Sequence, residues 1–461
     1  MYKIVVNCLA LLFLVSCKDS KDEYVAYFGG EIQNPTSKFL LFCKGDTVLD
    51  TIFLKKDNTF YKKFDSLTPG LYNFKNEPEY QYVYFDKNDS LMIRLNANDF
   101  DNSLIFCGRG DQKNNFLMEF FLKNEKDKDK LFEAFNYDVA KYNTLISAIE
   151  KENQDFYNKK KEIVKWSDGF DEIAKASVNY SYYIKKEIYP FIHQMRTGEA
   201  VKDKLPKDFY KYRNDVNFND KSIENFSPYI MFINFYINNK ADDYALNNDN
   251  SDQKMFTKSV RKLAIADSLL TNKTIKNSII NNIAYQFLQE NKSYENSQKF
   301  IEKYKKLVPD SEARQAVLES SMNAGKILNG KRLTSVELVD YNDKKINSDQ
   351  IFNKPTVICF WNSKMVSHYE AIHEKFQLLK KKFPQYQFVA INIDNFSADW
   401  KRVLDAKKYP LENEFHIADI ELLHDKWAVG KVHRVIILTQ NGIIKNGFSN
   451  LFEMNFEKEL E

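Results

Sequence analysis

Apolar and polar residues alternate with a period of two between Tyr24 and about Cys107. Short runs rich in Phe, Tyr, Leu and Ile are typical of β-strands, and they occupy residues 39–42, 51–54, 71–74, 82–85 and 91–95. Turn pairs such as Gly45-Asp46 and Pro69-Gly70 separate these runs. The pattern predicts an antiparallel β domain over residues 24–110.

The period becomes helical from about residue 111 to residue 329. One apolar stripe with spacings of three and four residues is Ile173, Ala176, Tyr180 and Ile184. Prolines at 190, 206, 228 and 309 are expected to punctuate the helices. The lone His193 lies beside Phe191 and Ile192 and is expected to belong to the core. This part of the chain is therefore predicted to be an all-α middle domain, residues 111–329.

Residues 330–461 have a different rhythm. An apolar run at 355–361 leads into an amphipathic helix, and a second apolar run follows at 388–393, which together predict a βαβ unit. Helical segments around 399–407 and 419–427, a hairpin around Gln440-Asn441-Gly442 and a last helix over 450–461 complete the domain. The predicted fold class is α+β multidomain, with an antiparallel β domain, an all-α middle domain and a C-terminal α/β domain.

The first residues have the layout of a secretory signal. Lys3 precedes a mainly apolar stretch that is too short to span a bilayer, and the stretch ends in Leu14-Val15-Ser16-Cys17. This ending resembles the lipobox of bacterial lipoproteins, which are cleaved before a cysteine that is then acylated. The resemblance implies a signal peptide over 1–16, a lipid on Cys17, a tether over 17–23 and a place in the cell envelope, with the outer membrane favoured and a periplasmic or surface-facing orientation left open. An ordinary N-terminal anchor or a chance cysteine is the alternative.

Charge and cysteine content narrow the class further. Sixty-seven basic and sixty-four acidic residues give a net charge of +3, and this near balance provides no electrostatic attraction for nucleic acid. Beyond Cys8 in the signal and Cys17, only Cys43, Cys107 and Cys359 remain, and an odd number excludes a disulfide framework. A single Cys43–Cys107 bridge stays open, but two buried thiols are favoured.

Two segments of the β domain carry a resemblance. The turn at 87–91 and the run at 100–110, completed by residues 114–117, are similar to an uncharacterised β-rich domain that precedes thioredoxin-like domains in envelope lipoproteins. No chemistry comes with this resemblance, because that domain has no established activity.

The C-terminal order of βαβ, helix, helix, ββα is that of the thioredoxin fold. Residues 329–331 through Phe360-Trp361-Asn362-Ser363 resemble the TlpA-like branch of membrane-bound thioredoxins. In that family a Cys-x-x-Cys pair opens the helix after the Phe-Trp strand, and a helix N-terminus stabilises the attacking thiolate. A cis-proline about 65 residues later presents backbone to the substrate.

Laid on this sequence, the family's redox positions hold other residues. Met365 and His368 occupy the two thiol positions, Lys364 replaces the usual Trp, and His433 stands at the cis-proline position. A thioether cannot become a thiolate, so no catalytic residues are expected. Cys359 is expected to be an inert thiol within a central buried strand.

The resulting hypothesis is a lipid-anchored envelope protein with a degenerate, redox-inactive thioredoxin-like domain and a binding or assembly role. Its expected partners are the membrane, reached through the lipid, and another envelope protein or peptide, without any cofactor. The alternatives are a divergent thiol–disulfide oxidoreductase and a copper-handling protein, because thioether and imidazole suit copper and Sco-type copper chaperones use this fold. A metal is not expected, since no pair of histidines shows metal-ligand spacing.

Overall fold

The computed structural model describes residues 24–76, 79–242, 251–291, 293–309, 311–430, 432–453 and 456–461. The chain divides into two compact units, Met1–Phe232 and Ile233–Glu461, and helix α6 (Ser227–Asp242) crosses the boundary. The helices after Phe232 thus group with the C-terminal sheet. The division into domains at 24–110, 111–329 and 330–461 stays a prediction. The signal peptide, Cys17 and the tether lie outside the described residues.

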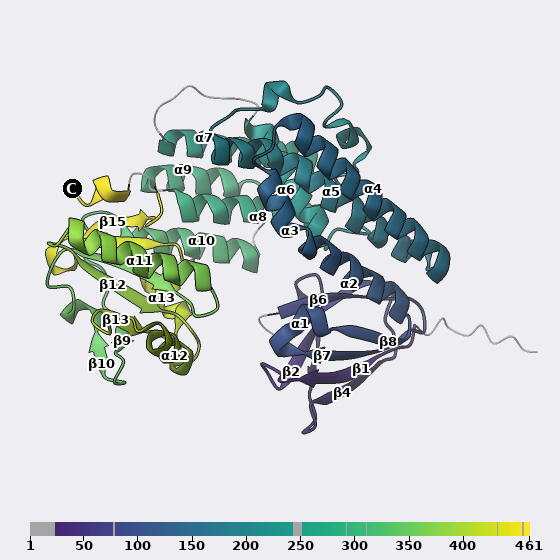
Figure 1. Ribbon diagram of the computed structural model, residues 1–461, viewed down its shortest axis with the longest axis horizontal. Helices are drawn as coiled ribbons and strands as arrows, with labels where there is room; N and C mark the ends of the chain where they lie inside the picture. The colour runs from purple at the N-terminus through teal and green to yellow at the C-terminus, as the bar shows by residue number, and fades with distance from the viewer. Residues whose placement is uncertain are drawn as a thin grey trace, which may run out of the picture. The chain divides into compact units, whose positions relative to one another are not determined.

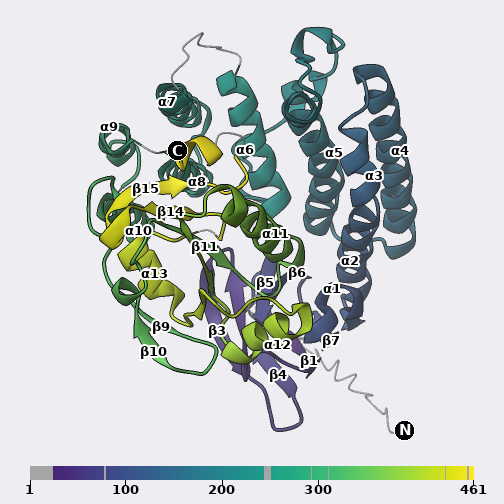
Figure 2. The same ribbon diagram turned by 60° about the vertical axis from the view of Figure 1, so that its left-hand side comes forward.

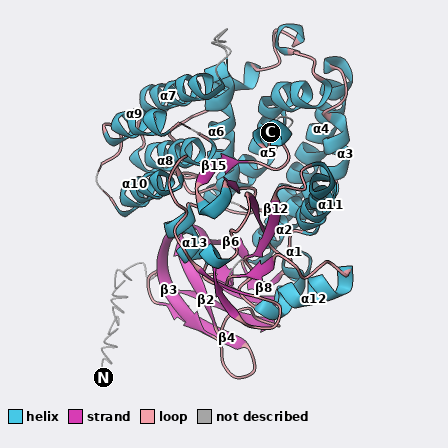
Figure 3. Cartoon of the chain, turned by 90° about the vertical axis from the view of Figure 1, so that its left-hand side faces the viewer, coloured by secondary structure: helices cyan, strands magenta, loops and turns pink. Residues whose placement is uncertain are grey.

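The first unit begins with a β-sandwich (Figure 3). Its two four-stranded sheets have the orders β4-β1-β7-β8 and β3-β2-β5-β6. The strands are β1 (Ala26–Gln33), β2 (Phe39–Lys44), β3 (Thr47–Phe53), β4 (Thr59–Phe64), β5 (Gly70–Asn76), β6 (Glu79–Phe85), β7 (Ser90–Asn96) and β8 (Ile105–Arg109). The described pairs are antiparallel except β1 with β7, which is parallel.

All five predicted runs fall on strands β2, β3, β5, β6 and β7. Strands β1, β4 and β8 were not predicted, because the first contains Gly29-Gly30, the second carries Lys62-Lys63 and the third is short. These strands are held by ladder pairing and by inward rings: Phe28 lies 5.4 Å from Phe74 and 5.2 Å from Phe60, ring centroid to ring centroid. Pairing with neighbouring strands therefore stabilises these three segments as strands, although their own alternation of apolar and polar residues is weak.

Cys43 and Cys107 remain thiols, so the bridge between them does not form. Cys43 is buried as expected, whereas Cys107 is exposed, which corrects the expectation of two buried thiols. The reason is the register of β8. Its inward position is taken by Phe106, so the neighbouring Cys107 points to the opposite side of the sheet.

Helices follow the sandwich in the first unit. A short α1 (Phe100–Ser103) precedes β8, and then come α2 (Asp111–Lys126), α3 (Lys128–Ala134), α4 (Val139–Val164) and α5 (Asp168–Thr197). Helices α4 and α5 run side by side (Figure 2).

Ser167 caps α5 by accepting a hydrogen bond from the backbone amide of Phe170, and Gly198 ends this helix in a left-handed conformation. Pro190 lies inside α5 instead of ending it, and its neighbour Tyr189 stacks on Tyr142 of α4. His193 is buried, as expected.

The second unit joins four helices to a mixed sheet (Figure 1). The helices are α7 (Ser251–Leu269), α8 (Lys273–Glu290), α9 (Tyr294–Lys305) and α10 (Glu312–Ala324). Polar contacts tie them to the sheet domain: Lys326 pairs with Asp425 at 2.5 Å, and the buried Arg434 guanidinium donates to the carbonyl of Gln289 in α8 at 3.1 Å.

The C-terminal sheet has seven strands in the order β10-β9-β13-β12-β11-β14-β15. Strands β11, β12 and β13 are parallel to one another, while β14 and β15 form an antiparallel hairpin. The elements are β9 (Glu337–Val339), β10 (Lys345–Asn347), β11 (Thr356–Trp361), α11 (Val366–Lys382), β12 (Gln387–Asn392), α12 (Ser397–Lys407), β13 (Glu414–His416), α13 (Ile420–Trp427), β14 (Val435–Leu438) and β15 (Ile444–Ser449). This is the thioredoxin-like order, so the predicted fold class is confirmed.

Helices α11 and α12 cover one face of this sheet and α13 covers the other. The predicted last helix over 450–461 is wrong, since the described part of that segment holds only a 3₁₀ turn, Phe456–Glu459. Phe456 and Leu460 anchor it to the α11 side of the sheet. Acidic residues crowd the end of the segment, where a helix dipole disfavours negative charge.

Candidate functional site

The three predicted site residues lie at the carboxyl end of β11. Met365 is the N-cap of α11, and its carbonyl accepts the amides of His368 and Tyr369 at 3.1 Å. His368 follows in the first turn of that helix, and His433 precedes β14, which is the antiparallel neighbour of β11. The mapping made from the sequence alone therefore brings these residues to one end of the sheet.

His368 and His433 are in direct contact. Their ring centroids lie 4.5 Å apart with an interplanar angle of 85°, an edge-to-face arrangement. Phe452, just after β15, lies 6.0 Å from the His368 ring. His368 is buried while His433 is exposed, and the Met365 side chain is 38% exposed. The two imidazoles thus meet at the carboxyl end of β11.

Burial decides the charge of His368. Loss of solvent, assisted by the neighbouring His433, lowers the pKa of His368 from 6.5 to about 4. Its Nδ1 atom is buried and has no hydrogen-bond partner. The imidazole is therefore neutral near pH 7, with one ring nitrogen unused by the described protein.

The loop that carries His433 is fixed by its neighbour in sequence. Arg434 is buried, and its guanidinium donates to the carbonyl of Gln289 at 3.1 Å and stacks on the ring of Phe448, 4.9 Å from the centroid. Burial lowers the pKa of Arg434 to about 10, so the side chain stays charged at neutral pH. This anchor holds His433 against α11.

Cys359 has no access to this site. It lies in the middle of β11, 1% exposed and paired on both sides, with Ala390 of β12 and Val435 of β14. Burial raises the pKa of its thiol above the usual value. A buried protonated thiol is a poor nucleophile, and the chain has no other cysteine after Cys107.

Two buried polar clusters near the site were not predicted. In the first, the Asp394 carboxylate accepts from the Ser363 amide at 3.1 Å and from the Asn392 side chain at 2.9 Å. His416 reaches Asn392 Oδ1 with Nδ1 at 3.0 Å. The cluster fixes the loop between β11 and α11, on which Met365 stands. The signal that could have revealed it is the polar Asn392 and Asp394 directly after an apolar strand.

The second cluster centres on Glu414 of β13. Its carboxylate contacts Nε2 of His373 at 2.9 Å and accepts from the Trp361 indole at 3.3 Å, and the Tyr409 ring stacks on His373 at 3.8 Å. Burial raises the pKa of Glu414, against the lowering effect of His373. Nε2 of His373 and the Trp361 indole both face the Glu414 carboxylate, and Nδ1 of His373 contacts the Tyr369 carbonyl at 2.6 Å, which indicates a structural role beneath the site.

The contacting imidazoles of His368 and His433 are ligand types that suit copper. The described part of the chain contains no group of three or more His, Cys, Asp or Glu residues placed to hold a metal ion. Among the described residues, no helix is both long and apolar enough to cross a bilayer.

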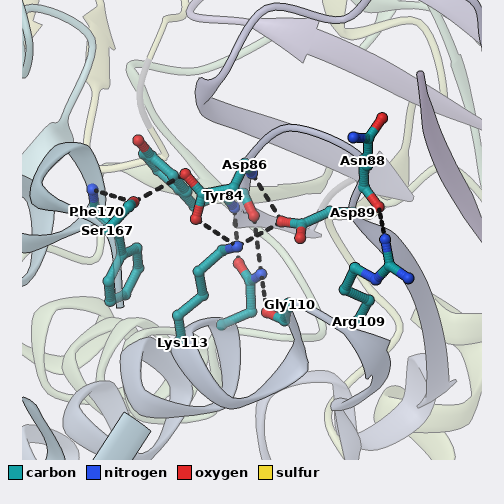
Figure 4. Close-up of polar contacts among 10 residues, drawn as sticks. Tyr84, Asp86, Asn88, Asp89, Arg109, Gly110, Lys113, Ser167 and Phe170 are labelled. Carbon is teal, nitrogen blue, oxygen red and sulfur yellow. Dashed lines mark hydrogen bonds and ion pairs between the residues drawn. The ribbon is translucent and has the colours of Figure 1, made fainter. Parts of the chain in front are cut away.

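The motif noted in the β domain forms a polar joint (Figure 4). The buried Lys113 ammonium of α2 pairs with Asp86 at 2.8 Å and with Asp89, both in the turn between β6 and β7. The side chain of Asn114 accepts a hydrogen bond from the backbone N–H of Tyr84 at 2.7 Å and donates one to the backbone carbonyl of Tyr84 at 2.9 Å. Ser167 at the start of α5 donates to Asp86 at 2.8 Å. These residues connect the sandwich to its helices, and Asp89 and Asn114 of the motif take part in the joint.

No protein-family model matches the chain, and none of the curated proteins matches it. Among solved structures, one described as a thiol-disulfide oxidoreductase from Bacteroides vulgatus is 21% identical, with a TM-score of 0.27, over 29% of this chain and 96% of its own. The C-terminal domain of a second protein described as a thiol-disulfide oxidoreductase, from Bacteroides thetaiotaomicron, is 21% identical with a TM-score of 0.24. The match covers 29% of this chain and 93% of that domain. A thiol:disulfide interchange protein from Bacteroides sp. is 13% identical, with a TM-score of 0.23, over 26% and 80%.

Proposed function

We propose that this chain is a lipid-anchored cell-envelope protein whose thioredoxin-like domain binds an envelope protein or peptide without exchanging thiols. The observation that carries the proposal is an exposed apolar rim at the carboxyl end of the central strands, where no thiol stands. The rim consists of Met365 at 38%, Val366 at 50%, Phe396 at 71% and Phe452 at 43% exposure. Exposed apolar side chains gathered at one place mark interaction sites.

The rim is built by several connections that end on the same side of the sheet. Met365 and Val366 follow β11, Phe396 follows β12, and Phe452 follows β15, which is parallel to β11 because each is antiparallel to β14. His433 enters the middle of this set before β14. In thioredoxin-like enzymes the same end of the sheet receives the substrate polypeptide. An extended segment can bind here through apolar side chains and backbone hydrogen bonds.

Redox inactivity is supported by the chemistry of the residues. Met365 cannot ionise, His368 is neutral, and the only cysteine of this domain is the buried Cys359. The anchor is supported by the lipobox-like Leu14-Val15-Ser16-Cys17. Acylation of Cys17 would place the chain on a membrane of the cell envelope.

Photo-crosslinking tests the rim. A photoreactive amino acid at Phe396 or Val366, in the full lipoprotein in its own membranes, should capture one defined partner that mass spectrometry identifies. The matched control is Leu378, which is 62% exposed on the same helix α11 as Val366 but three turns further on. Equal capture from Leu378, or none from either rim position, would contradict the proposal.

An insulin-reduction assay tests the absence of thiol exchange. The wild-type chain should reduce insulin no faster than the buffer with reductant alone. Activity that Cys359→Ser abolishes would establish the divergent oxidoreductase instead.

Copper handling is the second candidate function. The observation that favours it is the contact of His368 with His433, together with the unused Nδ1 atom of His368. Met365 at the N-cap of the same helix offers a thioether, and imidazole and thioether are copper ligands. Titration of the full chain with copper(I) should then show one bound ion, lost in His368→Ala/His433→Ala. Stoichiometric binding that the double variant retains would rule out this site.

A further inference from the structure

The first sheet of the sandwich presents one face away from the core. Its central row crosses all four strands as Tyr61, Gly29, Met92 and Cys107. The flanking rows are Lys63, Tyr27, Ser90 and Arg109 on one side, and Thr59, Glu31, Arg94 and Ile105 on the other. These three rows make up the outer face.

The outer face carries exposed apolar side chains. Tyr61 and Ile105 are each 55% exposed, although neighbouring inward residues such as Phe60 and Phe106 are almost fully buried. The ring of Tyr27 stacks on Tyr61 at 5.9 Å. The Met92 sulfur and the Tyr61 ring fill the space over Gly29, and a hollow near it is lined by Met92, Arg94, Cys107, Glu31 and Lys55 among others. Exposed apolar side chains on one face, here Tyr61 and Ile105, favour a partner with an apolar interior.

Cations surround the apolar positions. Lys63, Arg94 and Arg109 on the face and Lys55 at the hollow are exposed, and Glu31 is the acidic residue of the three rows. Lys63 also pairs with Asp65 at 2.7 Å. Tyrosines combined with a cationic rim match the interface of a bilayer, where aromatic rings sit at headgroup level and cations meet anionic lipids.

The chain outside the described residues limits the distance to a membrane. Six residues, 18–23, separate Cys17 from Tyr24, and even fully extended they reach at most about 25 Å. The strand that follows, β1, belongs to the outer-face sheet. The six residues, Lys-Asp-Ser-Lys-Asp-Glu, include no apolar side chain that could cover the face themselves.

We infer that the outer face docks on the lipid surface to which Cys17 anchors the chain, with Tyr27, Tyr61 and Ile105 at headgroup level. This inference rests on the proposed lipid anchor. The anchor supplies the proximity, and the face orients the sandwich on the membrane.

Vesicle binding of the unacylated chain tests the inference. The mature chain with Cys17→Ser should sediment with vesicles of phosphatidylethanolamine containing about one quarter phosphatidylglycerol, and binding should weaken in high salt. Tyr61→Glu/Ile105→Glu should lower the affinity by about tenfold or more. Phe53→Glu is the matched control, because Phe53 is 71% exposed on the other sheet of the same sandwich.

A second readout uses the exposed thiol. Cys107 lies on the outer face, whereas Cys43 and Cys359 are buried, so an environment-sensitive maleimide should label Cys107 selectively. Its emission should shift to shorter wavelength when anionic vesicles are added. The label should not shift in the Tyr61→Glu/Ile105→Glu background.

Three outcomes would overturn the inference. The wild-type chain could fail to bind vesicles, or the face variant and Phe53→Glu could bind equally. A wild-type dimer in sedimentation equilibrium, dissociated by the face variant and indifferent to vesicles, would assign the face to a second copy of the chain. Palmitate labelling of Cys17 in cells is scored separately. If Cys17 is acylated but the chain does not bind vesicles, this inference is wrong and the anchor stands. If the chain binds vesicles but Cys17 is not acylated, the anchor is wrong, and the face binds lipid without the proximity that the anchor would supply.

Discussion

At the residue scale, the neutral imidazole of His368 is the clearest departure from ordinary side-chain behaviour. The residue is buried against His433, and its Nδ1 atom has no hydrogen-bond partner. A buried unpartnered nitrogen costs stability, and such groups persist where packing or function compensates.

His368 should make folding stability depend on pH. The folded chain holds its pKa at about 4, whereas the unfolded value is 6.5, so the unfolded chain binds the proton first as the pH falls. The free energy of unfolding should therefore fall by about 2 kcal/mol between about pH 7 and about pH 4 through this residue. Urea unfolding of His368→Gln should show a shallower pH dependence than wild type. Parallel slopes for the two proteins would contradict the assignment.

Two glycines with positive φ should respond differently to substitution. Gly110 has φ +96°, and a Cβ there would lie 2.6 Å from the Asp89 carboxylate. Gly198 has φ +78° but open space around it. Gly198→Ala should cost about 1 kcal/mol from backbone strain alone, while Gly110→Ala should cost about 2–3 kcal/mol because the polar joint must also shift. Chemical unfolding of both variants measures the difference, and equal losses would show that the joint tolerates the Cβ.

At the scale of elements, the β6–β7 turn and helix α2 are joined by one buried cation. Lys113 neutralises Asp86 and Asp89, and the same turn receives Ser167 from the start of α5 (Figure 4). Burial raises the pKa of Asp89, which shows that its charge depends on the lysine for compensation. Three elements that are distant in sequence thus share one network.

Removing the cation should destabilise the first unit strongly. Lys113→Met leaves two carboxylates around an apolar side chain, and breaking a buried pair in this way costs about 3–5 kcal/mol. Lys128→Met, which removes an exposed pair with Glu125, should change stability by less than about 0.5 kcal/mol. Urea unfolding with a probe in the sandwich compares the two. The interpretation fails if the two variants lose similar stability, or if Asp89→Asn/Lys113→Met does not recover part of the loss.

At the scale of the whole molecule, contacts divide the chain into two units near Phe232. The sandwich belongs to the first unit and the thioredoxin-like sheet to the second. Each unit has its own apolar core, with Phe28 in one and Phe360 in the other. Cores of this kind unfold cooperatively on their own.

Calorimetry should accordingly resolve two unfolding transitions. Phe28→Ala and Phe360→Ala remove equally buried rings, and each should cost about 3–5 kcal/mol in its own unit. Each variant should lower the midpoint of one transition by roughly 10 °C and leave the other in place. A single transition moved equally by both variants would mean that the units fold as one.

The sequence predicted more of the fold than of the site. Alternation of period two revealed five of the eight sandwich strands, and the apolar runs ending in Phe360-Trp361 identified the thioredoxin-like sheet. These features depend on local patterning, which reports the face that a strand buries. Position within the motif also located Met365, His368 and His433. The three missed sandwich strands, the short β9, β10 and β13, and the false last helix lacked such patterning, and long-range pairing decided them.

What the sequence determined by itself is composition and order: the absence of a thiol at positions 365 and 368, the lipobox-like start and the succession of strand-rich and helix-rich segments. Only the tertiary structure decided which side chains meet. It placed His368 against His433, buried Glu414 beside Trp361 and Lys113 between two carboxylates, and exposed Cys107 and Tyr61 on one sheet face. The physical reason is that burial and contact depend on register between segments far apart in the chain. A residue's chemistry is written in the sequence, whereas its charge state and accessibility are set by its neighbours in space.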